Sequence, residues 1–226
     1  MKIDIISVHP DMFTGFLDHS ILKIGKDKGL IDIVVHDLRK WTEDKHSTVD
    51  DTPYGGGPGM IMKIEPFYKA IMELKQEDSY IILTTPTGEK YEQEKAHKFL
   101  DYRHLIIICG HYKGIDARID NFIDLKLSVG DYILTGGELP AAIVVDSVCR
   151  LIPGVISDLD SALSDSFENG LLDCSHYTRP SDFMGLKVPD VLLSGNHKMI
   201  DEWRHNDSVE TTRKNRPELL IKINKK

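Results

Sequence analysis

The sequence predicts an α/β fold with a mainly parallel sheet. Short apolar runs alternate with segments of helical periodicity, which is the order typical of βαβ units. The runs are rich in Ile, Val and Leu and lack polar alternation, as expected of strands that are covered on both faces. With 226 residues and 41% hydrophobic composition, the chain fits either one large domain or one domain plus a small appendage.

The elements of this fold can be assigned in chain order. We predict strands at Lys2–Val8, Ile31–Val35, Tyr80–Leu83 and Leu105–Cys109, separated by helices at Met12–Ile24, Glu65–Leu74 and Glu92–Leu100. A further helix is expected over Leu139–Ile152, because Pro140 falls in its first turn and Pro153 and Gly154 follow its end. This helix is apolar on most faces, so we expect it to be buried.

The composition changes after the last of these helices. Val155–Phe167 is rich in Ser and Asp and has no sustained period, which predicts a linker. A helix is then expected at about His197–Arg204, with Ser194 or Asn196 as its N-cap, and a second short helix near Pro217. The predicted domains are an α/β domain at 1–154, an interdomain linker at 155–170 and a small helical domain at 171–226.

The formal charge of −8 is unevenly distributed along the chain. Residues 179–226 hold ten Lys or Arg and seven Asp or Glu, a local charge of +3, against −11 for residues 1–178. A basic C-terminal segment on an acidic body permits contact with RNA, although charge alone favours a solvated helical face.

The cysteines and the apolar runs indicate where in the cell the protein works. Cys109, Cys149 and Cys174 lie far apart without a CxxC pair, which argues against a zinc site and against disulfides. No apolar run approaches the roughly 20 residues that span a bilayer, and Met1–Val8 is too short and too charged for a signal peptide. We expect a cytoplasmic protein with no membrane or DNA partner.

Three glycine-bearing turns follow apolar runs, at Leu83–Lys90, Ile108–Asp116 and Val129–Pro140. Singly, each fits a plain connection; together, they predict a small-molecule pocket lined by main chain, since ligands of parallel sheets bind beyond the carboxyl ends of the strands. None matches GxGxxG or GxxxxGK[ST], so no dinucleotide or P-loop site is indicated. A fourth loop, Thr48–Met60, fits either a flexible linker or a functional loop, and we favour function because it combines four glycines with Asp50, Asp51 and Tyr54.

Long motifs along the chain carry a family resemblance. In order, they are DDTPYGGGPGM, ICGHYKGID, GDYILTGGELP, RLIPGV, DSF, YTRP, VPDVLLSGNH and RPELL. From Met1 nearly to Lys226, the chain resembles the bacterial tRNA (guanine-N1)-methyltransferases of the TrmD type. The resemblance implies a SPOUT-like α/β domain that ends in a deep trefoil knot, a small helical C-terminal domain and a homodimer. It also implies S-adenosylmethionine as methyl donor, bound at Thr85, Pro86, Gly110, Val129, Gly130, Asp131, Tyr132, Ile133, Leu134, Gly136, Gly137 and Pro140.

The acceptor that the resemblance implies is N1 of guanosine 37, just 3′ of the anticodon, in tRNAs where another guanosine precedes it. This nitrogen carries a proton, so methylation requires a general base. Asp165 in the DSF motif matches the family's base, and Arg150 matches the arginine that balances charge on guanine O6. Without the resemblance, Asp165 would read as a solvated turn residue and Arg150 as a partner of a helix C-terminus. A base on a linker further implies a site that is completed when tRNA binds.

The basic C-terminal segment then fits a surface for the tRNA anticodon arm, with Trp203, Arg204, Arg213, Lys214 and Arg216. We expect no dedicated metal site, because His176 and His197 lie apart and lack a third ligand at ordinary spacing; the family nevertheless leaves room for Mg²⁺ without a protein cage. Lys113 stands where many members carry an acidic residue, and His111 where some carry an arginine.

Three alternatives remain at this point. One is a related knotted methyltransferase that acts on another RNA position, and another is a catalytically silent RNA-binding protein on the same scaffold. The third, a doubly wound oxidoreductase, is disfavoured by the missing GxGxxG pattern.

Overall fold

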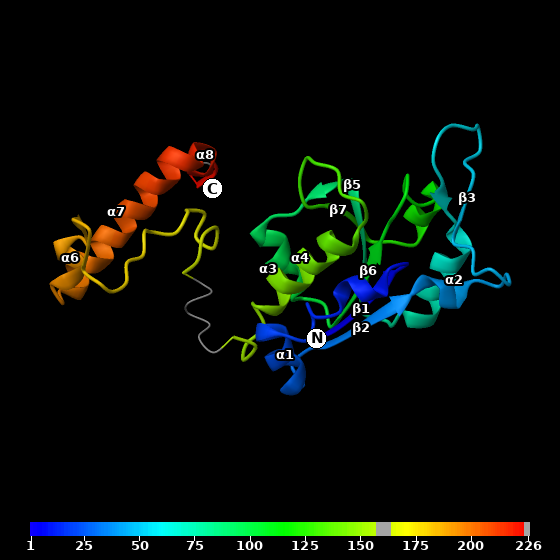
Figure 1. The fold of residues 1–226 in the computed structure, drawn as a ribbon, viewed down its shortest axis with the longest axis horizontal. Helices are drawn as coiled ribbons and strands as arrows, with labels where there is room; N and C mark the ends of the chain where they lie inside the picture. The colour runs from blue at the N-terminus through cyan, green and yellow to red at the C-terminus, as the bar shows by residue number, and fades with distance from the viewer. Residues whose placement is uncertain (157–163, 224–226) are drawn as a thin grey trace. The chain divides into compact units, whose positions relative to one another are not determined.

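The computed structural model describes residues 1–156 and 164–223, drawn in Figure 1. The chain divides into two compact units, Met1–Leu159 and Asp160–Lys226. Within the predicted 155–170 linker, residues 157–163 lie outside the described part of the chain.

The first unit is built on a five-stranded sheet of order β2-β1-β6-β5-β7, in which every neighbouring pair is parallel. This confirms the predicted α/β class. The strands are β1 (Lys2–Ser7), β2 (Asp32–Asp37), β5 (Ser79–Lys90), β6 (His104–Cys109) and β7 (Leu125–Ser128). All four predicted strands are present. The sequence analysis missed β7, whose four residues, LKLS, include only two apolar side chains.

Both faces of the sheet are covered, which explains the unbroken apolar runs. On one face Leu105, Ile107 and Cys109 join a core with α1 (Ser20–Asp27), α3 (Gln93–Phe99) and α4 (Glu138–Cys149). On the other face Ile106 and Ile108 join a core with α2 (Ile64–Leu74), η2 (Leu38–Trp41) and η3 (Ala117–Asn121). Successive side chains of β6 therefore enter opposite cores, as the period of two in a strand requires.

The predicted helix at Met12–Ile24 is wrong in its middle. The chain instead forms η1 (Pro10–Phe13), then turns, and starts α1 only at Ser20. Gly15 has φ of +84° and Ser20 has φ of +54°, and both values lie in the left-handed region that interrupts a right-handed helix. The other helices of this unit start and end within a few residues of their expected limits.

The second unit is mainly helical. It contains α6 (Asp190–Leu193), α7 (His197–Asn215), α8 (Pro217–Ile223) and an antiparallel pair, β8 (Asp182–Phe183) with β9 (Leu186–Lys187). Asn196 caps α7, and its side-chain oxygen accepts from the amide of Met199 at 3.4 Å. The predicted end of this helix at Arg204 is too early, because no proline or glycine stops the helix before Pro217. Among the described residues, no helix is long and apolar enough to cross a membrane.

Candidate functional site

The end of β5 leaves the sheet and exposes main chain. Its pairing with β7 shifts so that Thr84 and Glu89 both lie opposite Leu127. The four residues between them, Thr85–Gly88, stand outside this ladder, and Pro86 is exposed. Gly88 makes the excursion possible, because a Cβ there would lie 2.4 Å from the amide nitrogen of Leu127. Gly88 lies in the predicted Leu83–Lys90 turn, but its sequence context did not indicate this role.

The second and third glycine turns meet where β6 ends and α4 begins. The amide of Gly137 donates to the carbonyl of Gly110 at 2.8 Å. A Cβ on Gly137 would lie 2.3 Å from Thr84 Oγ1 and 2.8 Å from Cys109 Cα, so only glycine fits this position. Thr84 Oγ1 is buried, 3.0 Å from the carbonyl oxygen of Ile108 and 3.2 Å from that of Gly137. The three turns are thus fastened to one another through main chain.

The residues predicted to bind the methyl donor lie at this edge of the sheet in different environments. Thr85 and Pro86 lie on the excursion after β5, and Gly110 follows β6 directly. Gly136 bridges His111, and Pro140 is buried in the first turn of α4. Val129–Leu134 leaves β7 at the same edge, with Tyr132 54% and Ile133 81% exposed. The apolar side chains of this last segment lie on the surface, where they are available to a ligand or a partner.

A buried polar cluster supports the junction and escaped the sequence analysis. Ser7 Oγ donates to Glu138 Oε1 at 2.7 Å and accepts from the amide of His9 at 2.8 Å. Glu138 is 2% exposed, and its Oε2, like Nδ1 of His111, is a buried atom without a hydrogen-bond partner among the described residues. Burial and the charge of Glu138 raise the pKa of the Cys109 thiol well above its ordinary value, so this cysteine stays protonated.

The Thr48–Met60 loop is anchored to the turn after β6. Its ends form an antiparallel pair, β3 (Asp50–Asp51) with β4 (Ile61–Met62). The amide of Lys113 donates to the carbonyl of Met60 at 3.1 Å, and that of Met62 to the carbonyl of Gly114 at 2.9 Å. Tyr54, at the tip of the loop, is completely exposed. The favoured functional role of this loop remains a prediction.

The two predicted catalytic residues belong to different units. Arg150 is the C-cap of α4 in the first unit and is half-buried. Asp165 lies in the second unit at the start of a turn, since the amide of Glu168 donates to the carbonyl of Asp165 at 3.4 Å. The amide of Phe167, within this turn, donates to the carbonyl of Leu171 at 2.7 Å. The guanidinium of Arg216 lies 5.8 Å from the centroid of the Phe167 ring. The turn that carries Asp165 is therefore held against the helical part of its own unit.

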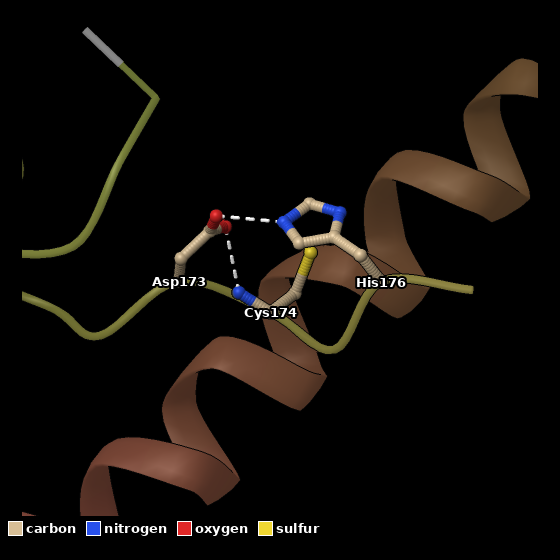
Figure 2. A group of neighbouring side chains, drawn as sticks. All are labelled: Asp173, Cys174 and His176. Atoms are coloured by element: carbon tan, nitrogen blue, oxygen red, sulfur yellow. Dashed lines mark hydrogen bonds and ion pairs between the residues drawn. The ribbon is translucent and has the colours of Figure 1, made fainter. Parts of the chain in front are cut away.

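The second unit also brings together three possible metal ligands, Asp173, Cys174 and His176, whose ligand atoms lie within 4.8 Å of one another. Figure 2 shows the hydrogen bonds from His176 Nε2 and from the Cys174 amide to the Asp173 carboxylate, both 2.7 Å long. Burial disfavours the charged carboxylate, but these hydrogen bonds hold the pKa of Asp173 below its ordinary value. The sequence analysis missed this group because it looked for histidines at ligand spacing.

The fold and the site define a class of protein. A parallel sheet with glycine turns at its carboxyl edge belongs to the α/β class, in which ligands commonly bind beyond the carboxyl ends of the strands. The family model for tRNA (guanine-1)-methyltransferase TrmD matches residues 1–222. The chain belongs to this family.

Curated relatives agree over nearly the whole length. The tRNA (guanine-N(1)-)-methyltransferase of Dictyoglomus turgidum is 52% identical over 222 residues, which cover 98% of this chain and 91% of that protein. The protein of the same name from Bacteroides thetaiotaomicron is 53% identical over 223 residues, which cover 97% of this chain and 99% of that protein. The resemblance that the motifs carried is confirmed.

Proposed function

We propose that this chain is a tRNA (guanine-N1)-methyltransferase that modifies guanosine 37 in tRNAs with a preceding guanosine, using S-adenosylmethionine. Membership of the family supports the reaction class and the need for this donor. The observation that carries the proposal is the junction of Thr84, Gly110 and Gly137, which joins three glycine turns at the carboxyl edge of the sheet. Such an edge is where parallel α/β sheets bind their ligands.

The residues at this edge fit an adenosyl group. Thr85 and Pro86 stand outside the β5–β7 ladder, so main-chain groups beside them are available to the edge of an adenine ring. Tyr132 and Ile133 supply exposed apolar surface for its face. Gly110, Gly136 and Gly137 keep side chains out of the space between the turns. The remaining residues assigned to the donor, Val129, Gly130, Asp131, Leu134 and Pro140, continue the same wall.

Asp165 would accept the proton that the reaction releases, and Arg150 would stabilise the negative charge that develops. When bound, the donor supplies an electrophilic methyl group on a sulfonium sulfur. The Asp165 carboxylate would accept the proton of guanine N1, which frees the nitrogen lone pair to bond to the methyl carbon as its bond to sulfur breaks and the donor leaves as a neutral thioether. The Arg150 guanidinium lies at the developing negative charge on O6 and stabilises it. Because the two residues belong to different units, we propose that tRNA binding completes the site.

The proposed assembly is a cytoplasmic homodimer of knotted protomers. The trefoil knot is implied by the family. Although α4 is largely buried, Leu139 is 53% and Ile143 is 43% exposed. These two residues lie four apart, on one face of the helix, and they give a second protomer an apolar stripe to cover.

No dedicated Mg²⁺ site is part of the proposal. Lys113, which stands where many members carry an acidic residue, packs its side chain against Gly59 and brings a positive charge to this turn. The Asp173, Cys174 and His176 group includes a thiol and an imidazole, which Mg²⁺ does not prefer.

The decisive test is transfer of labelled methyl from S-adenosylmethionine to a tRNA transcript with the G36–G37 step. We expect label on N1 of G37, none on a transcript with A37 and none with the Asp165→Ala enzyme. Label on both transcripts would move the target to another RNA position. Binding of tRNA without any transfer would instead identify a silent RNA-binding protein.

A further inference from the structure

The second unit contains a cavity that none of the residues assigned to the methyl donor or to catalysis lines. It has a volume of about 400 Å³ and lies between the Ser175–Ser181 segment and the helices α6 and α7. Leu192 and Ile200 form part of its apolar wall. This volume is within the range of small-molecule pockets, and all of the lining residues come from the second unit alone.

Two aromatic side chains line the cavity. Tyr177 and Trp203 lie with ring centroids 6.2 Å apart and planes tilted by 60°. Tyr177 is 50% exposed, so a large part of its ring is free to stack on a planar group from outside. Exposed aromatic rings beside cationic groups are the usual platform for single-stranded bases.

The charge of the cavity is opposite to that of the whole chain. Its lining includes Arg179, Arg204 and His176, and none of its described lining residues is acidic, although the chain carries a net charge of −8. Arg204 Nη1 forms an ion pair with Asp201 Oδ1 at 3.6 Å, which is longer than a hydrogen bond. Asp173 orients the His176 ring through a bond of 2.7 Å (Figure 2). An anionic group is therefore the favoured occupant of the rim.

We propose that this cavity binds one unstacked nucleotide of the tRNA anticodon loop, other than the guanosine that is methylated. The base stacks on Tyr177 and Trp203, and the flanking phosphate is held by Arg179 and Arg204. The identity of the RNA rests on the proposed function; the choice of a nucleotide rests on the aromatic rings, the cations and the volume. The cavity would hold the loop in register while a different nucleotide reacts, because phosphate contacts position an RNA without reading its sequence.

Trp203 offers a direct probe, because the only other tryptophan, Trp41, lies in the first unit. In a Trp41→Phe protein, all tryptophan emission comes from Trp203. We would titrate this protein with a tRNA anticodon stem-loop, and then with stem-loops that carry an abasic nucleotide at each loop position in turn. We expect the intact stem-loop to quench the emission, and abasic substitution at one position other than 37 to abolish the quenching.

Paired variants separate stacking from folding. Tyr177→Leu removes the ring and should weaken stem-loop binding about 10-fold, whereas Tyr177→Phe keeps the ring and should bind normally. Arg179→Gln should weaken binding and reduce its salt dependence. The control is Lys198→Gln, because Lys198 is an exposed cation on α7 that lies outside the cavity. Unchanged circular dichroism and thermal unfolding would show that each variant is folded.

The outcomes keep this inference distinct from the proposed function. If wild-type protein methylates G37 but the stem-loop leaves Trp203 emission unchanged, the cavity is not a nucleotide site although the enzyme is as proposed. The same conclusion follows if Tyr177→Leu and Arg179→Gln bind as tightly as Lys198→Gln. Quenching that depends on one loop position, in a protein that transfers no methyl group, would support the cavity and overturn the proposed reaction.

Discussion

In the first unit, Thr84 and Gly137 lie buried where β5, β6 and α4 meet, whereas in the second unit Tyr177 and Arg179 lie exposed on an irregular segment. The buried junction is fastened by main chain and leaves no room for a Cβ. The exposed segment presents long side chains around a cavity. A rigid donor site and an adaptable RNA surface suit the two proposed ligands, because a small molecule needs a preformed pocket and a loop of RNA has bases that can be splayed out.

The largest expected effect is on catalysis in the second unit. Asp165→Asn removes the proposed proton acceptor but keeps the size of the side chain. We expect methyl transfer to fall by about 10²–10⁴-fold while donor binding is retained, as measured by single-turnover methylation and by calorimetric titration with S-adenosylmethionine. Glu168→Gln, which neutralises a carboxylate in the same turn, is the control and should keep its activity. An equal loss in both variants would remove Asp165 from the role of base.

A second prediction concerns the buried junction of the first unit. Gly137→Ala should lower the free energy of unfolding by about 1–3 kcal/mol, because its Cβ would overlap Thr84 and Cys109. Gly110→Ala is the matched variant, since nothing lies closer than 3.7 Å to its added Cβ. We expect it to unfold like the wild type but to bind the donor more weakly. Equal melting temperatures for the two variants would contradict the close packing at Gly137.

The polar support beneath that junction should also matter for stability. Ser7→Ala leaves the buried Glu138 carboxylate without its hydrogen-bond donor, and we expect a loss of about 1–3 kcal/mol in urea unfolding. Ser7→Thr, which keeps the hydroxyl, should recover part of this loss. If both variants were as stable as the wild type, the Ser7–Glu138 bond would contribute nothing to the fold.

The last prediction concerns the free energy of unfolding at acid pH. It compares the Asp–His pairs of the two units. Burial opposes ionisation of Asp4, but hydrogen bonds from His36, Lys2 and His104 together lower its pKa to about 2. A lowered pKa stabilises the fold above the ordinary pKa of Asp, so about 2 kcal/mol should be present above pH ~4 and lost as the pH falls towards 2. Asp4→Asn should therefore make the free energy of unfolding depend less on pH over this range. Asp173→Asn should change the free energy of unfolding by less than about 1 kcal/mol, because His176 is exposed and exposed ion pairs are screened by solvent.

An equal response of the two Asp variants to acid would contradict this comparison. The measurement is urea unfolding at a series of pH values between about 2 and 6, with the wild type alongside. It separates the two units most clearly if each transition is followed by the tryptophan of its own unit, Trp41 or Trp203.

Much of the first unit could be predicted from the sequence because its strands are buried on both faces. The run at Leu105–Cys109 is apolar throughout, and this pattern marked β6 without any knowledge of its neighbours. The short strand β7 could not be found in the same way, since it is defined by pairing with β5 and not by its own composition. The predicted helix at Met12–Ile24 failed because positive φ at Ser20 follows from the packed chain and not from a strong local signal.

Some features of the candidate site could also be predicted from the sequence, whereas others depend on tertiary contacts. The glycine turns were visible as motifs, and the family resemblance supplied their proposed ligand. Glu138 gave no signal, because a glutamate at the start of a helix is ordinarily exposed and favourable there. Its burial depends on Ser7, which lies 131 residues earlier in the chain. The cavity beside Tyr177 and Trp203 was equally hidden, since its walls come from a loop and two helices that no local pattern joins.

The sequence by itself determined the α/β class, the apolar strands, a cap for α7 at Ser194 or Asn196 and the family, because each depends on neighbouring residues or on ordered motifs. Only the tertiary structure decided that Thr84, Gly110 and Gly137 meet, that Glu138 is buried against Ser7, and that Tyr177 lies beside Trp203 in the lining of a cavity. These contacts join residues far apart in the chain. They exist only once the sheet and helices have packed, because packing fixes which distant backbones can approach without a side chain between them.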